Sequence, residues 1–170
     1  MDIARFIRDV PDFPIEGILF KDITPLLGNA EALQSTIDAL VAHYADSQID
    51  RVVAIESRGF IFGTPLSLAL NAGFVPIRKP GKLPADTLSV EYSLEYGTNT
   101  LEMHTDAIQP DERVLVVDDL LATGGSAKAA ISLVERCQGQ VVGTAFVIEL
   151  AFLNGREALE GYDVFSLLTY

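Results

Sequence analysis

The sequence predicts an α/β protein with a central, mostly parallel sheet flanked by helices. Short apolar runs rich in β-branched residues recur along the chain, and amphipathic segments with helical spacing lie between them. The length of 170 residues suits one domain with a single core. Because several of the apolar runs are uninterrupted, we expect strands that are buried on both faces, as in parallel sheets.

The first half of the chain contains one helix followed by a strand, a helix and a second strand. The first helix is expected over residues 29–47, with Asn29 as its N-cap. The run RVVAI at residues 51–55 predicts a buried strand, and helical spacing resumes over residues 60–71. The next strand is expected over residues 74–78.

The second half repeats this strand, turn and helix unit. RVLVV at residues 113–117 predicts a strand, and a glycine-rich turn leads into a helix over residues 126–137. Two more strands are expected over residues 141–150 and 163–168. Ligands of such sheets bind beyond the carboxyl ends of the strands, near the point where the strand order reverses. We therefore expect the functional site there.

Composition excludes several classes of function. Twelve Lys and Arg against 24 Asp and Glu give a net charge of −12, which disfavours binding to nucleic acid and to anionic membranes. One cysteine, Cys137, and two histidines, His43 and His104, argue against a disulfide and a zinc site. The chain has no signal-peptide pattern and no apolar run of membrane-spanning length, so we expect a soluble, cytoplasmic protein.

The most informative segment is VLVVDDLLATGGS at residues 114–126. A buried strand leads to the adjacent carboxylates Asp118 and Asp119, and a loop with two glycines then enters a helix. Glycines allow successive N–H groups to converge on one anion at a helix N-terminus. The carboxylates cannot face that anion, but they can accept hydrogen bonds from sugar hydroxyls beside it. Ribose 5-phosphate has this layout.

A simpler interpretation of the same segment is a helix capped by Ser126, with Asp118 and Asp119 solvated. Adjacent acids seldom follow a fully apolar strand without a function, which favours the sugar-phosphate site. The segment has neither the Gly-Lys-[Ser/Thr] ending of a Walker A loop nor the G-x-G-x-x-G pattern of dinucleotide folds.

Two cationic segments follow the preceding strands. Glu56-Ser57-Arg58-Gly59 places an arginine and several N–H groups at a helix start, which predicts a second anion site. The alternative is that Arg58 only pairs with Glu56.

Arg78, Lys79 and Lys82 are the densest cationic cluster in the chain. Three cations in five residues suit a highly charged anion, although a solvated turn at Pro80-Gly81 is the alternative.

Residues 114–126 resemble the phosphoribosyl-pyrophosphate (PRPP) binding motif of type I phosphoribosyltransferases. Further blocks resemble the adenine branch of that family, in the same order and over nearly the full length. They are residues 13–27, 56–63, 78–84, 92–97 and 148–159. The resemblance implies transfer of phosphoribose from PRPP to adenine, giving AMP and pyrophosphate, with Mg²⁺ held mainly by the substrate, and a homodimer.

The resemblance also implies an organisation of the chain. It suggests one domain over residues 1–170 with the type I phosphoribosyltransferase fold. Residues 10–28 and 149–160 would form a small hood over the site, and residues 82–104 would form a flexible lid hairpin.

Binding roles follow from the resemblance residue by residue. The ribose and its 5-phosphate are assigned to Asp118, Asp119, Ala122, Thr123, Gly124, Gly125 and Ser126. Pyrophosphate is assigned to Glu56, Ser57, Arg58, Gly59, Lys79 and Lys82, with a cis peptide bond near residues 56–57. Arg78 is expected to hold its loop or to reach a neighbouring subunit.

The base and the reacting groups are assigned in the same way. Adenine is expected between Phe20 and Leu150, with main-chain groups of Leu19 and Lys21 at its hydrogen-bonding edge. The catalytic residues implied are Arg58, Glu95 as general acid/base at a purine ring nitrogen, and Tyr96 closing over pyrophosphate.

Two other functions are compatible with this site. One is a phosphoribosyltransferase for another base, such as xanthine or guanine. The other is a PRPP-sensing regulator that binds the ligand without catalysis, which would be expected to have a basic face or a DNA-binding module.

Overall fold

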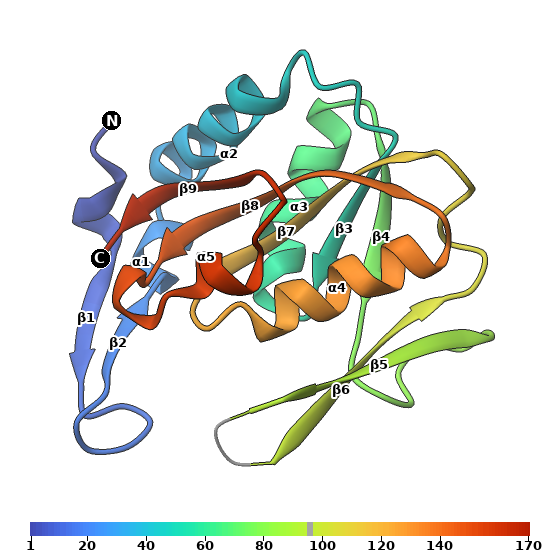
Figure 1. Cartoon of the computed structure of the whole chain (residues 1–170). Coiled ribbons are helices and arrows are strands. Elements are labelled where there is room, and N and C mark those ends of the chain that lie inside the picture. The colour runs from blue at the N-terminus through green and yellow to red at the C-terminus, as the bar shows by residue number, and fades with distance from the viewer. Residues whose placement is uncertain (95–96) are drawn as a thin grey trace.

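A five-stranded parallel sheet with the order β4-β3-β7-β8-β9 forms the centre of the molecule (Figure 1). The structure is a computed structural model and describes residues 1–94 and 97–170. The strands are β3 (Arg51–Ile55), β4 (Gly73–Ile77), β7 (Arg113–Leu121), β8 (Gln140–Glu149) and β9 (Val164–Thr169). The predicted α/β class is confirmed, and the strand order reverses between β3 and β7.

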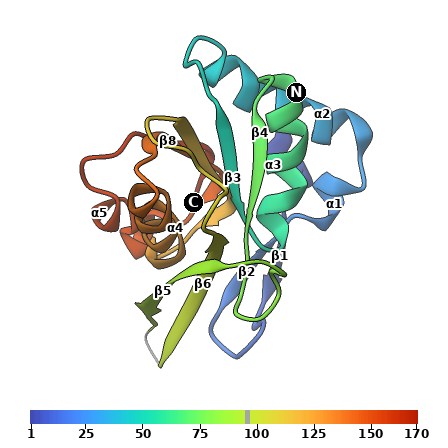
Figure 2. The same cartoon turned by 90° about the vertical axis from the view of Figure 1, so that its right-hand side faces the viewer.

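Helices cover both faces of this sheet. Figures 1 and 2 show α2 (Ala30–Tyr44) and α3 (Arg58–Ala69) on one face and α4 (Gly125–Arg136) on the other. The short elements are η1 (Ile3–Phe6), α1 (Thr24–Leu27), η2 (Ala151–Leu153) and α5 (Gly155–Ala158). None of the helices described here is long and apolar enough to cross a membrane.

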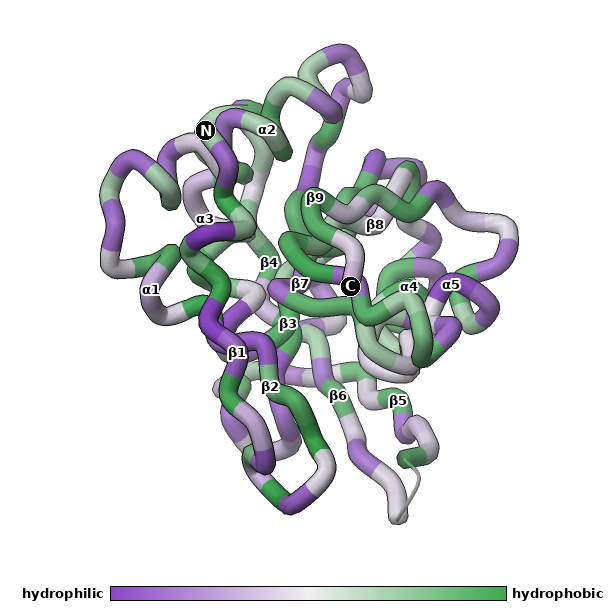
Figure 3. The backbone as a smooth tube through the Cα atoms, turned by 90° about the vertical axis from the view of Figure 1, so that its left-hand side faces the viewer, coloured by the Kyte–Doolittle hydropathy of each residue, from purple (hydrophilic) through white to green (hydrophobic). Residues whose placement is uncertain are grey.

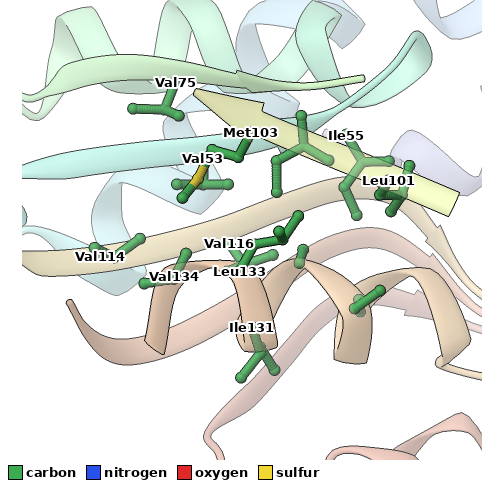
Figure 4. Packing of buried hydrophobic residues seen from close by; sticks show 14 of the residues in the cluster. Val53, Ile55, Val75, Leu101, Met103, Val114, Val116, Ile131, Leu133 and Val134 are labelled. Carbon is green, nitrogen blue, oxygen red and sulfur yellow. The ribbon is translucent and has the colours of Figure 1, made fainter. Parts of the chain in front are cut away.

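Side chains of successive strand residues point to opposite faces of the sheet, and this alternation produces two hydrophobic cores. Val53 and Ile55 of β3 pack on the α4 face, whereas Val52, one residue away, packs on the α2 and α3 face. Figure 4 shows the α4 face, where Leu133 and Val134 of α4 lie against the strands. Both faces of the sheet are therefore covered by apolar side chains.

Two antiparallel hairpins lie outside the main sheet. β5 (Thr87–Ser93) pairs with β6 (Thr98–His104), which places a hairpin within residues 82–104, where one was expected. β1 (Arg8–Pro11) pairs with β2 (Leu19–Asp22). Both hairpins lie at the end of the sheet where β3 ends (Figures 1 and 2). Along β2 the residues change from hydrophobic to hydrophilic (Figure 3).

Most element bounds agree with the sequence within one or two residues, and Asn29 caps α2 by accepting a hydrogen bond from Ala32 N–H at 2.9 Å. The largest difference is β7, which was expected to end at residue 117 and continues to Leu121 because its last residues pair with β8. Asp118 and Asp119 therefore lie inside this strand, which holds their main chain in extended form.

Gly63 of α3 provides a test of helix and sheet packing. A Cβ at this position would lie 2.6 Å from the Cβ of Ala54 on β3 and 3.2 Å from the ring of Phe74. We expect Gly63→Ala to lower the free energy of unfolding by about 1–3 kcal/mol in urea denaturation, because the added methyl group overpacks the core. Gly28→Ala is the control, since its Cβ would meet no atom closer than 3.4 Å. Equal stability of the two variants would contradict this packing argument.

Candidate active site

The segment of residues 122–126 comprises the loop after β7 and the first two residues of α4, and it packs closely on both sides. Gly124 has φ 85°, and a Cβ there would lie 2.6 Å from the carbonyl oxygen of Gly155. On the other side, a Cβ on Gly125 would lie 3.1 Å from the ring of Tyr92 on β5. A cavity of about 130 Å³ lies at this loop. The backbone N–H groups of this segment lie at the start of α4, and helix N-termini of this kind favour anions such as phosphate.

The two adjacent carboxylates lie beside this loop. Asp119 is only 5% exposed, and the Asp118 carboxylate accepts a hydrogen bond from the Asp119 N–H at 2.8 Å. Desolvation, and after it the negative charge of Asp119, raise the pKa of Asp118 well above its usual range. The alternative of solvated aspartates at a capped helix is therefore wrong for Asp119.

Arg58, the first residue of α3, contacts the acid pair directly. Its Nε lies 2.8 Å from Oδ2 of Asp119, and its guanidinium carbon lies 5.7 Å from the ring centroid of Phe20. The helix comes this close because Gly59 has no side chain: a Cβ there would lie 3.0 Å from Oδ1 of Asp118. Arg58 thus pairs with Asp119, and the alternative that it pairs with Glu56 is wrong.

Glu56 organises the cationic segment instead. Its carboxylate accepts hydrogen bonds from Lys79 N–H and Lys82 Nζ, both at 2.7 Å, and lies 3.4 Å from Arg78 Nε. Desolvation opposes ionisation, but the bonds from Lys82 and Lys79 outweigh it and lower the pKa of Glu56. The Glu56 side chain is 7% exposed, so a nearly buried carboxylate anchors this loop, while Pro80 and Gly81 at its turn are exposed to solvent.

The residues assigned to the base come from two separate segments. Phe20 lies on β2 with its ring edge-on to Phe13 at 5.2 Å, and a cavity of about 260 Å³ lies beside both. Leu150 follows β8 directly and donates its N–H to the carbonyl oxygen of Leu121. Leu19 is half exposed, and the Lys21 side chain turns to Asp9 and Tyr170.

Three more expectations from the sequence concern the peptide bond after Glu56, the residues Glu95 and Tyr96, and metal binding. The peptide bond between Glu56 and Ser57 is cis. Glu95 and Tyr96 lie outside the described residues. In the part of the chain that the structure describes, no group of three or more His, Cys, Asp or Glu side chains is placed to hold a metal ion.

Three features of the site were missed from the sequence. They are the packing of Tyr92 on Gly125, the close approach of Gly155 to Gly124, and the anchoring role of Glu56. All three join segments far apart in the chain. The only available signal was that Tyr92, Gly155 and Glu56 each fall within a block that resembles the family.

The fold and this site together define a phosphoribosyl transferase domain, whose family model matches residues 25–167. Adenine phosphoribosyltransferase of Halothermothrix orenii is 61% identical over 99% of both chains. The crystal structure of adenine phosphoribosyltransferase from Thermoanaerobacter pseudethanolicus has a TM-score of 0.97 at 52% identity and covers 99% of this chain and 98% of that one.

A complex of the Saccharomyces cerevisiae enzyme with an imino-altritol bisphosphate and adenine has a TM-score of 0.94 at 44% identity, covering 98% of this chain and 97% of that one. The chain therefore belongs to the adenine phosphoribosyltransferase family.

Asp118 provides a test of the electrostatics. A carboxyl whose pKa is raised by folding favours the folded state at low pH and costs stability as pH rises through that raised value. Asp118→Asn keeps the shape without the charge, so we expect a higher Tm at pH 7.5 and a gain that shrinks as pH falls toward about 4. Asp46→Asn, at an exposed position, is the control. A lower Tm for Asp118→Asn at pH 7.5 would contradict a raised pKa for Asp118 in the folded protein.

Proposed function

We propose that this protein transfers the 5-phosphoribosyl group of PRPP to adenine and releases AMP and pyrophosphate. Family membership supports the reaction, since relatives matching the whole chain have this activity in their names. The observation that carries the proposal is the 2.8 Å ion pair between Arg58 and Asp119. It joins the acid pair to the second anion site, so one sugar bearing phosphates at both ends can contact both.

We assign the unreactive 5-phosphate and the ribose to one side of the ion pair between Arg58 and Asp119. The phosphate would lie against Ala122, Thr123, Gly124, Gly125 and Ser126, where main-chain N–H groups at the start of α4 are available. Asp118 and Asp119 would accept hydrogen bonds from the ribose hydroxyls. Both contacts hold the ring in place while its anomeric carbon gains positive charge.

On the other side, we assign the leaving pyrophosphate. Arg58 with the main chain of Ser57 and Gly59 would bind one phosphoryl group, and Lys79 and Lys82, held by Glu56, would bind the other. Arg58, Lys79 and Lys82 cannot ligate a metal ion, so we assign Mg²⁺ mainly to oxygens of the pyrophosphate and ribose and to water, which are ligands that Mg²⁺ prefers. Bound Mg²⁺ would neutralise charge on the leaving group.

We assign the base to the space between Phe20 and Leu150, where main-chain groups of Leu19 and Lys21 would meet its edge. A carbonyl oxygen accepts a hydrogen bond from the exocyclic amine of adenine but repels the oxo group of hypoxanthine or guanine, which supports adenine as the substrate. Glu95 would serve as general acid/base at a ring nitrogen, and Tyr96 would close over pyrophosphate. The adenine nitrogen then attacks the anomeric carbon on the face opposite the leaving group.

The decisive experiment measures product formation. The protein is incubated with PRPP, Mg²⁺ and, separately, adenine, hypoxanthine, guanine or xanthine, and nucleoside monophosphates are separated by chromatography. AMP as the main product is expected. A different monophosphate would favour a phosphoribosyltransferase for another base. PRPP binding without any product would favour a PRPP-sensing regulator that does not catalyse transfer.

We also propose that the chain acts as one domain, with residues 10–28 and 149–160 as the hood and residues 82–104 as the lid, and that it is a cytoplasmic homodimer. The single cysteine suits a reducing compartment. Exposed apolar side chains on α3, Ile61 and Leu68, support a partner surface. Light scattering measures the assembly.

Arg58 provides a kinetic prediction. We expect Arg58→Ala to raise the KM for PRPP about 10- to 100-fold and to lower kcat, because a charge-assisted contact to the leaving group is lost. Arg5→Ala is the control, since Arg5 is highly exposed and, among the residues that the structure describes, forms its ion pair with Asp2. Steady-state kinetics with adenine at saturation measure both variants. An unchanged KM and kcat for Arg58→Ala would remove Arg58 from the pyrophosphate site.

A further inference from the structure

Tyr170 extends β9 alongside Leu150. Its N–H donates to the carbonyl oxygen of Glu149 and its carbonyl oxygen accepts from the N–H of Ala151, both at 2.9 Å. These two bonds bracket Leu150, as in a parallel ladder, so the main chain of Tyr170 is registered directly opposite Leu150. Any group that binds the Tyr170 ring is thereby tied to the segment assigned to one side of the base.

The group that binds this ring is Lys21 of β2. Its Nζ lies 3.9 Å from the centroid of the Tyr170 ring, within the range of a cation–π interaction, and 2.6 Å from Oδ1 of Asp9. The Lys21 side chain is only 10% exposed. Lys21 is therefore held from two sides, by its own hairpin and by the end of the main sheet.

Lys21 adjoins Phe20, which is assigned to the other side of the base. Because neighbouring residues of a strand point to opposite faces, a strand anchored through Lys21 presents Phe20 on its other face. On that face the Phe20 ring lies 5.7 Å from the guanidinium carbon of Arg58. The contact between Lys21 and Tyr170 thus connects the two segments that carry Phe20 and Leu150.

Main-chain bonding does not make this connection. β1 and β2 pair with each other as a separate two-stranded sheet, and none of the described strands of the five-stranded sheet pairs with them. Arg8 and Thr24 bond to Asp22 within the same N-terminal region. The separation between the hairpin and the sheet is therefore set by side-chain contacts and by the flanking residues Ile7 and Ile23, which pack in the core on the α2 and α3 face.

We infer that Tyr170 is a positioning residue for recognition of the base. Its ring holds Lys21, and through Lys21 the β1–β2 hairpin, at the separation from Leu150 that a purine ring fills. This inference rests on the proposed function. It assigns to the Lys21 side chain a role away from the base and leaves the Lys21 main chain free to serve at the edge of adenine.

The kinetic test compares Tyr170→Leu with Tyr170→Phe. Leucine removes the ring face, whereas phenylalanine keeps it and removes only the hydroxyl group. We expect Tyr170→Leu to raise the KM for adenine about fivefold or more, while the KM for PRPP stays near that of the wild type. Tyr170→Phe should restore most of the adenine KM. Lys21→Met, which removes the cation and keeps the ring, should reproduce the effect of Tyr170→Leu.

A second measurement does not depend on activity. Amide hydrogen exchange over residues 8–22 should be faster in Tyr170→Leu than in the wild type and in Tyr170→Phe. Unchanged exchange would overturn the inference, because the contact would not hold the hairpin. Faster exchange with an unchanged adenine KM, or an equal rise in both KM values, would also overturn it. Failure of the proposed function is distinguishable, because it shows in the wild-type protein as absence of AMP formation.

Discussion

The ion pair between Arg58 and Asp119 is the contact on which the site depends. It requires α3 to begin within hydrogen-bonding distance of the end of β7, and Gly59 permits that approach because any side chain there would press on Asp118. β3 and β7 must also be neighbours, and the reversal of strand order between them makes them so. The two proposed anion sites and the acid pair then share one edge of the sheet.

Glycines and buried charges set the geometry around that pair. Gly124 lets the segment of residues 122–126 pack against Gly155, and Glu56 fixes the loop that carries Lys79 and Lys82. The phosphate-facing residues and Leu150 therefore come from the main sheet and the segments that follow its strands, whereas Phe20 and the segment assigned to the lid come from two hairpins outside that sheet, of which β6 is bridged to Arg78 through Glu102. This division suits an enzyme that holds a phosphorylated sugar firmly and admits a flat base beside it.

Sequence patterns predicted the sheet and its helices well, because apolar periodicity reports burial directly. They missed β1 and β2, since four-residue strands carry too little periodicity to be recognised. They also ended β7 four residues early, because Asp118 and Asp119 resemble a strand terminus although pairing with β8 continues past them. Candidate site residues were found from motifs, but their partners were not: no local pattern indicates that Arg58 contacts Asp119 and that Glu56 contacts Lys82.

Glu56 and Asp119 have a consequence for which anions this surface admits. Lys82 and Arg78 already have Glu56 as a carboxylate partner, and Arg58 has Asp119, in a protein whose net charge is −12. An incoming anion must compete with these internal partners for the same guanidinium and ammonium groups. Chloride or a single carboxylate brings too little charge to do so, whereas a pyrophosphate group brings several charged oxygens at once. At the proposed pyrophosphate site, the internal carboxylates would thus favour polyanions over the abundant small ions of the cell.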